Sequence, residues 1–207
     1  APLLCLATLA RVVDTAPAVA AMTGSSHRLV VVPSSRGETV DRDATREALE
    51  SALVSGEKSV ELAVDYTEPD ISEDELGAGI LVDISERTLT LYVDGRVQKT
   101  YGVAVGTPGH PTPRGSFHIT LKRYMPTWSN PGSAWAAGMP SYIPPGPSNP
   151  LGTRALNIDS PGIRIHGTSA DYSIGTAASH GCMRMHRWDI EELYELVEVG
   201  DPVFIVR

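Results

Sequence analysis

Cysteine is scarce in this chain of 207 residues, which holds 2, Cys5 and Cys182. Two cysteines in very different surroundings do not indicate a disulfide framework, so each thiol needs a separate explanation. Cys5 lies in or beside an apolar stripe, where a small buried hydrophobe is the usual role of a cysteine. Cys182 has polar, glycine-flanked neighbours instead, which argues against the same role.

Positive charge is also in short supply. The 17 Lys and Arg residues face 25 Asp and Glu residues, which gives a formal net charge of −8. The basic residues are scattered singly or in pairs such as Lys122-Arg123, whereas a phosphate-binding surface needs clustered positive charge. The composition therefore argues against a nucleic-acid partner.

No long hydrophobic run is free of charges. The most apolar stretch, Ala1 to Met22, is interrupted by Arg11 and Asp14 and follows no basic segment, so we expect neither a signal peptide nor a membrane span there. Because the chain begins at Ala1, we expect any export signal, and any membrane anchor, to lie upstream of residue 1.

Residues 1–70 are predicted to form a small α/β domain. Apolar residues three or four apart predict a helix over Pro2–Val13, and the β-branched run Arg28–Val32 predicts a strand. Asp41 is the expected N-cap of a helix that ends at Gly56, and Val60–Val64 is the expected closing strand. An acidic stretch that contains proline then indicates a junction before a second domain at residues 77–207.

The second domain is predicted to begin as a β-meander. The expected strands are Gly79–Ile84, Arg87–Val93 and Arg96–Val105, the last two joined by the hairpin signal Asp94-Gly95. Ser116–Leu121 alternates again, which would place Phe117, Ile119 and Leu121 on one face. Near the end, Asp189 is expected to cap a helix that leads to a last strand, Val203–Val206.

A long segment without periodicity, Tyr124 to Gly152, separates these elements. It is rich in Pro, Gly, Ser and Asn, and Trp128, Trp135 and Tyr142 are spaced through it. Loops this long in a compact domain are usually functional or disordered. The aromatic residues favour a functional loop, as a lid or a substrate wall.

The residues that carry chemistry lie between Ile163 and Met185. Alternation places His166 on the polar face of a short strand, and Ser179-His180-Gly181-Cys182 follows. A free thiol with a pKa of about 8.5 needs a base or a cationic neighbour to become a nucleophile, and the two histidines are candidates. Gly181 would let consecutive backbone N–H groups at Gly181 and Cys182 converge on one oxygen. Base, thiol and oxyanion donors together indicate acyl transfer through a thioester.

Two other interpretations of these residues are open. Either histidine alone would most simply be a hydrogen-bonded structural residue, and Cys182 alone a buried inert thiol. His180, Cys182 and His186 with His166 could also ligate a metal, but they lack a recognised paired-ligand spacing such as HExxH or CxxC. We therefore expect no metal and no cofactor.

The sequence IHGT followed by SHGCMRM resembles the signature of the L,D-transpeptidase catalytic domain, a family of cysteine enzymes that cross-link bacterial peptidoglycan. Weaker matches run through most of residues 77–207, namely Gly106-Thr107, Pro111 to Gly115, Asn130-Pro131, Pro144 to Pro147 and Asn149 to Gly152. The resemblance implies an α+β fold that is mainly β and sandwich-like, with a lid over the site. Residues 1–70 resemble more loosely a small domain thought to contact peptidoglycan, and a spacer role for them is equally open.

The resemblance also implies roles for individual residues. His166 would be the base for Cys182, and His180 would orient the site beside it. The backbone of His180, Gly181 and Cys182 would form the oxyanion hole, and Arg184 would bind a substrate carboxylate. Further substrate-binding residues are expected at Ser179, Gly167, Tyr142 and Trp128.

The implied reaction begins with attack of Cys182 on the third residue of a peptidoglycan stem tetrapeptide, with release of terminal D-Ala. A side-chain amine of a second stem would resolve the thioester into a 3→3 cross-link. Water as the acceptor would instead make the protein an L,D-carboxypeptidase. The alternative that is not an enzyme is a catalytically silent module that binds the cell wall. The resemblance further implies an exported protein of the bacterial cell envelope, and β-lactams, carbapenems above all, as covalent inhibitors.

Overall fold

The structure is a computed structural model that describes residues 13–25 and 27–207. The chain divides into two units, one formed by Ala1–Ala21 with Val32–Glu75 and the other by Met22–Val31 with Leu76–Arg207. Cys5 and all but the last residue of the helix predicted over Pro2–Val13 lie outside the described residues. No helix in the described part of the chain is long and apolar enough to cross a membrane.

The first unit is a small α/β arrangement. Strands β3 (Gly37–Val40) and β4 (Val64–Thr67) pair antiparallel and are joined by helix α2 (Arg42–Ser55), and the 3₁₀ turn η1 (Glu73–Glu75) follows. Asp41 accepts the N–H groups of Asp43 and Ala44, and Gly56 ends the helix with a left-handed φ of 78°, so both predicted caps are confirmed.

The strand predicted over Val60–Val64 is wrong in its position. β4 begins where that strand was expected to end, because its partner β3 offers only Gly37–Val40 and the pairing runs from Val40 opposite Val64 to Gly37 opposite Thr67. The apolar residues of the predicted segment precede the paired part of the chain. Pairing, not apolar content, determines where this strand lies.

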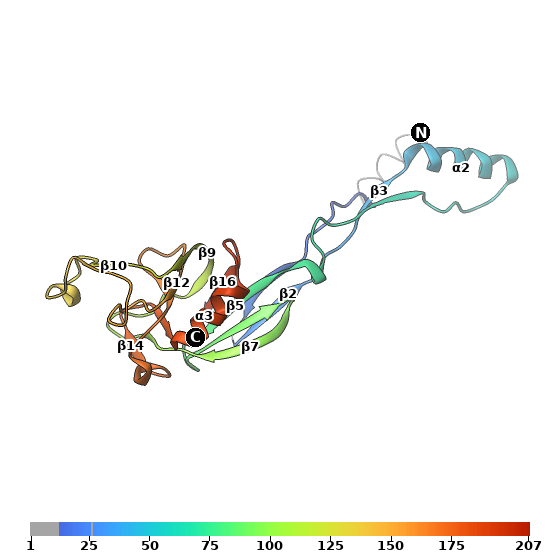
Figure 1. Cartoon of the computed structure of the whole chain (residues 1–207). Helices are drawn as coiled ribbons and strands as arrows, with labels where there is room; N and C mark the ends of the chain where they lie inside the picture. Colours follow the sequence, from blue (N-terminus) through green and yellow to red (C-terminus); the bar gives the residue numbers. More distant parts are fainter. Residues whose placement is uncertain (1–12, 26) are drawn as a thin grey trace. The chain divides into compact units, whose positions relative to one another are not determined.

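The second unit is built on one large, nearly barrel-like sheet with few helices, which confirms the predicted mainly β fold (Figure 1). In the described residues this sheet has eight strands in the order β15-β13-β12-β9-β16-β5-β6-β7. Their bounds are β5 (Ala78–Asp83), β6 (Thr88–Val93), β7 (Arg96–Gly102), β9 (Gly115–Tyr124), β12 (Arg154–Ile158), β13 (Arg164–Gly167), β15 (Met183–Met185) and β16 (Pro202–Val206). The predicted β5-β6-β7 meander, with its Asp94-Gly95 turn, is present.

The return strand of the meander is shorter than predicted. β7 ends at Gly102, and Val105 belongs to a separate short strand, β8 (Val105–Gly106), which pairs in parallel with β14 (Ala177–Ser179). Val103 turns the chain between them, with its N–H bonded to the carbonyl of Arg87. This turn brings β8 beside the segment that leads to Cys182.

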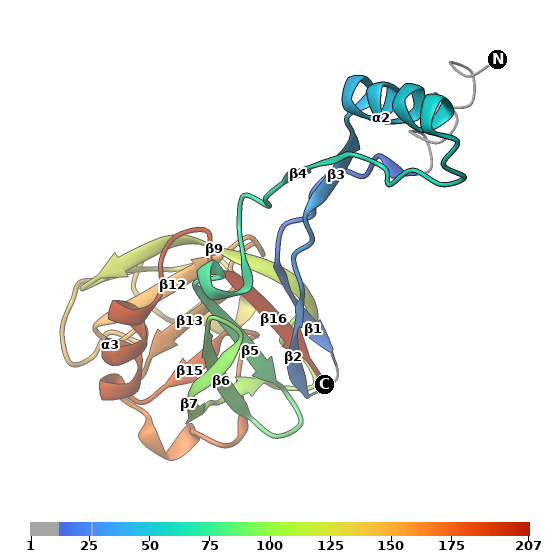
Figure 2. The same ribbon diagram turned by 90° about the vertical axis from the view of Figure 1, so that its right-hand side faces the viewer.

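Helix α3 (Arg187–Leu196) packs against β12 and β13 and buries Ile190 and Leu193 in the core (Figure 2). The predicted cap at Asp189 is wrong. The helix begins earlier, with His186 in the N-cap position and the first helical hydrogen bond from Ile190 N–H to His186 O. Asp189 instead lies in the first turn, near the positive end of the helix dipole, which favours a negative charge.

Strand β9 breaks the alternation that the sequence predicted. Ile119 pairs with Ile158 but Leu121 pairs with Asn157, so Thr120 is an extra residue on β9 and forms a bulge. Phe117 and Ile119 face the core, whereas Leu121 turns to the opposite face and is 44% exposed. The prediction for Leu121 is therefore wrong.

A hairpin from the N-terminal part of the chain belongs to the second unit. Strands β1 (Ala21–Ser25) and β2 (Arg28–Val32) pair with each other, and the predicted strand over Arg28–Val32 is confirmed. Leu29 is buried with Leu81, Tyr92 and Phe204 of the main sheet, and Met22 packs against the same cluster. The hairpin thus covers apolar sheet residues that lie far from it in sequence.

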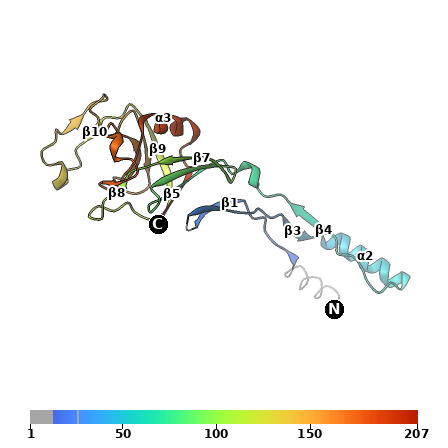
Figure 3. The ribbon, with the colours of Figure 1, turned by 90° about the horizontal axis from the view of Figure 1, so that it is seen from below.

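The long segment Tyr124–Gly152 is an ordered loop that projects from the sheet and carries β10 (Trp128–Ser129) (Figure 3). It contains a second short strand, β11 (Tyr142–Ile143), and a 3₁₀ turn, η2 (Ala134–Ala136). Asn130 Nδ2 donates to the carbonyls of Ala136 and Met139, and Asn149 Nδ2 donates to those of Pro126 and Ile143. These side-chain amides add to the short β10-β11 pair in holding the loop together.

Candidate active site

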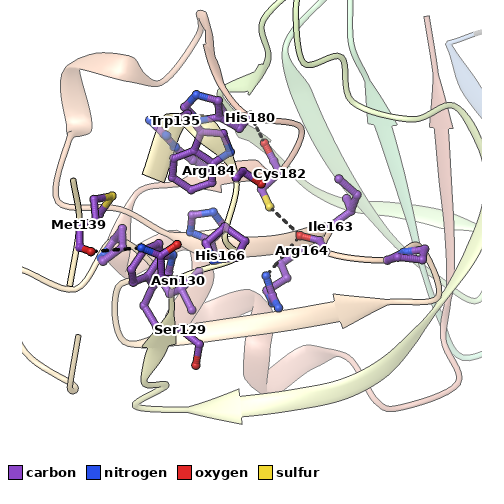
Figure 4. A pocket seen from close by; sticks show the side chains of 18 residues that line it. Ser129, Asn130, Trp135, Met139, Ile163, Arg164, His166, His180, Cys182 and Arg184 are labelled. Atoms are coloured by element: carbon purple, nitrogen blue, oxygen red, sulfur yellow. Dashed lines mark hydrogen bonds between the residues drawn. The ribbon is translucent and has the colours of Figure 1, made fainter. Parts of the chain in front are cut away.

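Two adjacent strands place the predicted catalytic residues on one face of the sheet. β13 and β15 pair in parallel with His166 opposite Arg184, and Cys182 immediately precedes β15. Because alternate residues of a strand share a face, Arg164 and His166 point to the same side as Cys182 and Arg184. Figure 4 shows these side chains around a cavity of about 450 Å³, which all four line.

The surroundings of Cys182 favour the protonated thiol. Its Sγ–H donates to the carbonyl of Gly162 at 3.4 Å. Burial raises the pKa of the thiol, and the N–H and guanidinium of Arg164 and the guanidinium of Arg184 lower it only in part. A thiol of this kind needs a base to become a nucleophile at neutral pH.

His166 has the properties of such a base. Its Nδ1 donates to the carbonyl of Gly167 at 2.7 Å, which fixes the tautomer that leaves a lone pair on Nε2. Burial lowers the pKa of His166 to about 4, the Gly167 hydrogen bond raises it, and Arg184 and Arg164 lower it further. The imidazole is therefore neutral at physiological pH.

The turn before Cys182 is organised by Ser179. Its hydroxyl donates to the carbonyl of Cys182 at 2.6 Å and accepts the N–H of Gly181 at 3.1 Å. Gly181 has φ +107°, a backbone conformation that residues with a Cβ rarely adopt, so glycine is strongly favoured at this position. The N–H of Gly181 was predicted to be an oxyanion donor, but in the structure it donates to Ser179 Oγ instead.

His180 contacts the long loop Tyr124–Gly152 and not the thiol. Its exposed ring stacks on Trp135 with centroids 4.2 Å apart and an interplanar angle of 11°, and it meets the edge of His110 at 4.8 Å. Burial, His110 and Arg184 lower the pKa of His180. The ring is thus neutral and serves as a packing surface for the wall of the cavity.

The other predicted substrate-binding residues divide into two groups. Trp128, Ser179 and Arg184 line the cavity. Gly167 and Tyr142 are not among its lining residues: Gly167 is buried, and a Cβ there would lie 3.0 Å from Ile190, whereas Tyr142 is 66% exposed on β11. Gly167 orients His166 through its carbonyl, so its role is positional.

Most of the lining residues were given no individual site role from the sequence. Among them, Trp135 and Asn130 come from the long loop Tyr124–Gly152, and Arg164 comes from β13. Strand alternation already placed Arg164 on the face of His166, so that signal was available. Nothing in the sequence pattern distinguished Trp135 from Tyr142.

The cavity is cationic in an acidic protein. Arg164 and Arg184 line it, and none of its lining residues is Asp or Glu, although the chain carries a net charge of −8. Such a cavity favours a ligand with carboxylate groups over a cationic one. Arg164 is held in place by Nε donating to Asn157 Oδ1 at 3.2 Å and by Nη1 donating to Gly162 O at 3.2 Å.

The metal interpretation gains no support from the geometry. In the described part of the chain, no three His, Cys, Asp or Glu side chains gather closely enough to hold an ion. His186 bonds to Asp171 at 3.0 Å and stacks on Trp188, so it contacts neither Cys182 nor His166.

Comparison with known proteins identifies the family. Residues 77–205 match the family model of the L,D-transpeptidase catalytic domain. The chain belongs to this family. Residues 5–61 match a second model, described as "Putative peptidoglycan binding domain", so both predicted resemblances are confirmed.

Individual relatives agree with this membership. The chain is 33% identical over 144 residues to "Probable L,D-transpeptidase ErfK/SrfK" of Escherichia coli, a match that covers 66% of this chain and 46% of the relative. It is 38% identical to "Putative L,D-transpeptidase YkuD" of Bacillus subtilis, which covers 62% of this chain and 65% of the relative. The chain therefore spans about half to two thirds of the length of these L,D-transpeptidases.

A solved structure has the same fold. L,D-transpeptidase 3 of Mycobacterium tuberculosis, determined with a faropenem-derived adduct, superposes with a TM-score of 0.52 at 22% identity and covers 92% of this chain and 98% of its own. At that identity the likeness concerns the fold.

Proposed function

We propose that this L,D-transpeptidase family member forms 3→3 cross-links in peptidoglycan through a thioester on Cys182. The donor is a stem tetrapeptide whose third residue is an L-centred diamino acid. The observation that carries the proposal is a neutral His166, its Nε2 lone pair left free by the Nδ1 bond to Gly167, on the same cationic cavity as Cys182.

The acylation step transfers one proton from the thiol to the leaving D-Ala and replaces a C–N bond by a C–S bond. The thiol leaves the Gly162 carbonyl and gives its proton to Nε2 of His166, while Sγ attacks the carbonyl carbon of the third stem residue. His166 then passes the proton to the nitrogen of terminal D-Ala as the C–N bond breaks. A thioester and free D-Ala result.

Deacylation repeats these movements in reverse. The side-chain amine of a second stem attacks the thioester, His166 accepts a proton from the amine, and the thiolate of Cys182 leaves and regains that proton. An amide bond between two third residues is formed. With water in place of the amine, the same steps would yield a tripeptide, and the enzyme would act as an L,D-carboxypeptidase.

The oxyanion of each tetrahedral intermediate needs donors in the Cys182 turn. We assign this role to the N–H groups of Cys182 and His180, since that of Gly181 is bonded to Ser179. Arg184 and Arg164 would hold the carboxylates of the stem, and Trp128 and Trp135 would form the apolar wall of the cavity.

The wider setting follows from the same chemistry. We propose that the protein is exported and acts in the bacterial cell envelope, where residues 5–61 contact peptidoglycan. The thiol that attacks a stem carbonyl would also attack the strained ring of a β-lactam. A faropenem-derived adduct on a protein of the same fold supports this expectation.

The test is mass spectrometry of a disaccharide-tetrapeptide after incubation with the protein. A dimer lighter by one D-Ala than two monomers supports transpeptidation, whereas tripeptide alone would indicate a carboxypeptidase. Cys182→Ala is expected to abolish both products and any covalent β-lactam adduct, and Cys5→Ala is the matched control that should retain them. Turnover by Cys182→Ala would overturn the mechanism.

A further inference from the structure

A second groove, of about 400 Å³, is lined in part by the same loop as the catalytic cavity. Both are bounded by the loop from Asn149 to Gly152: Pro150 and Leu151 line the catalytic cavity, while Asn149 and Gly152 line the groove. The start of α3 and the segment after β13 also line the groove, with Ser169, Asp171, Arg187 and Trp188 among their residues. We call it the α3 groove. None of the catalytic side chains lies in it.

Trp188 forms a fixed aromatic platform in the α3 groove. The side chain is 57% exposed, although it is among the largest apolar groups of the chain. One face of its ring stacks on His186 at a centroid distance of 4.6 Å and an angle of 10°, and Asp171 Oδ1 holds His186 Nδ1 at 3.0 Å. The stack with His186 restricts the motion of the indole, which lowers the entropy cost of stacking a ligand on its other face.

The polar residues of the α3 groove suit a neutral ligand. Asp171 and Arg187 offer one charge of each sign, and Ser169 adds a hydroxyl. The catalytic cavity differs, because it is lined by two arginines and no carboxylate. A neutral molecule with many hydroxyl groups matches an aromatic face beside a carboxylate, a guanidinium and a hydroxyl, since its C–H face can lie on the ring while its hydroxyls form hydrogen bonds at the edge.

We propose that the α3 groove binds the amino-sugar strand to which the reacting stem is attached, an inference that rests on the proposed function. The stem joins the sugar through its first residue and reacts at its third. Three extended residues span roughly 10 Å, so the sugar is expected to bind outside the thiol cavity. Trp188 is then a specificity residue that favours stems on glycan over free peptides.

The first test is binding and does not require catalysis. Chitotetraose, a neutral amino-sugar chain without a stem, is titrated into full-length Cys182→Ala protein while the indole N–H signals of its 3 tryptophans are followed by NMR. Trp188→Phe assigns the Trp188 signal. We expect that signal to shift at millimolar sugar while those of Trp128 and Trp135 stay in place. A Trp188 signal that does not move up to about 20 mM sugar would overturn the proposal, whether or not the enzyme cross-links stems.

The second test compares two donors, a disaccharide-tetrapeptide and the free tetrapeptide. Loss of one aromatic contact is expected to raise KM for the glycan-linked donor about five- to tenfold in Trp188→Ala, with KM for the free peptide unchanged. Trp188→Phe should keep most of the preference, and Leu196→Ala, at the other end of α3, should keep all of it. An equal loss for both donors would indicate a structural role and contradict the proposal.

Discussion

The hydroxyl of Ser179 and the carbonyl of Cys182 are joined by a hydrogen bond of 2.6 Å that closes the turn in front of the thiol. The same hydroxyl accepts the N–H of Gly181, so one buried side chain holds both the His180–Gly181 peptide and the Cys182–Met183 peptide. These two peptides flank the one that carries the N–H of Cys182.

Ser179→Ala should loosen this turn without unfolding the protein. Misplacement of a reacting group by about 1 Å can cost roughly a hundredfold in rate, so we expect the rate of acylation by a carbapenem to fall by about ten- to a hundredfold. Alkylation of Cys182 by iodoacetamide, which needs no oxyanion donor, should change much less. Equal losses in both reactions would show that Ser179 supports the thiol itself and not the oxyanion hole.

The pH dependence of acylation follows from the two pKa shifts at the site. Burial lowers the pKa of His166 to about 4 and raises that of Cys182, so the neutral imidazole and protonated thiol coexist over a broad range. The acylation rate should therefore be level between about pH 5.5 and 8 and fall on the acid side as His166 is protonated. Single-turnover rates from pH 3.5 to 8 would test this, and an acid limb near pH 6.5 would contradict it.

Arg184 should influence both binding and this acid limb. Its positive charge lowers the pKa of His166, so Arg184→Ala should raise that pKa and move the acid limb toward neutral pH. The same variant should bind stems with a free terminal carboxylate about tenfold more weakly, as expected for loss of one charge-assisted hydrogen bond. Arg96→Ala, which removes an exposed arginine of β7 that lines neither the cavity nor the α3 groove, is the control for both measurements. Unchanged affinity for the free carboxylate would remove the assignment.

His166 also makes the folded protein sensitive to acid. Its pKa is depressed on folding from 6.5 to about 4, so the unfolded chain binds the proton more readily between these values and stability falls as pH decreases through that window. The free energy of unfolding should drop by up to about 3 kcal/mol from this group, at 1.36 kcal/mol per pKa unit. Denaturant unfolding at pH 7 and pH 4 should show a smaller loss in His166→Gln, which retains the titrating carboxylates. An equal loss in both proteins would contradict the depressed pKa.

The β1-β2 hairpin should stabilise the catalytic unit although it precedes it in sequence. Leu29 is 7% exposed against Leu81, Tyr92 and Phe204, and truncation of a buried leucine costs about 2–5 kcal/mol. We expect Leu29→Ala to lower the unfolding free energy of the catalytic unit by about 2–3 kcal/mol. Leu53→Ala, at a position 81% exposed on α2, should leave it unchanged. A neutral Leu29→Ala variant would show that the hairpin contributes little to stability.

The sequence alone predicted several local elements and the chemistry that we propose for the site. Helix α2 was predictable because Asp41 and Gly56 act on the backbone within a few residues of themselves. The proposed pairing of His166 with Cys182 came from motif likeness, because residue types alone left both His166 and His180 as candidates for the base. Arg164 could have been added, since strand alternation needs no tertiary information.

Tertiary structure decided whatever depended on a distant partner. The position of β4 is determined by β3, and the exposure of Leu121 by a bulge in the pairing with β12. The choice of Trp135 over Tyr142 as cavity wall depends on the stack with His180, and the direction of the Gly181 N–H depends on the rotamer of Ser179. These features arise from contacts between segments that the sequence does not order in space, so local propensity could not specify them.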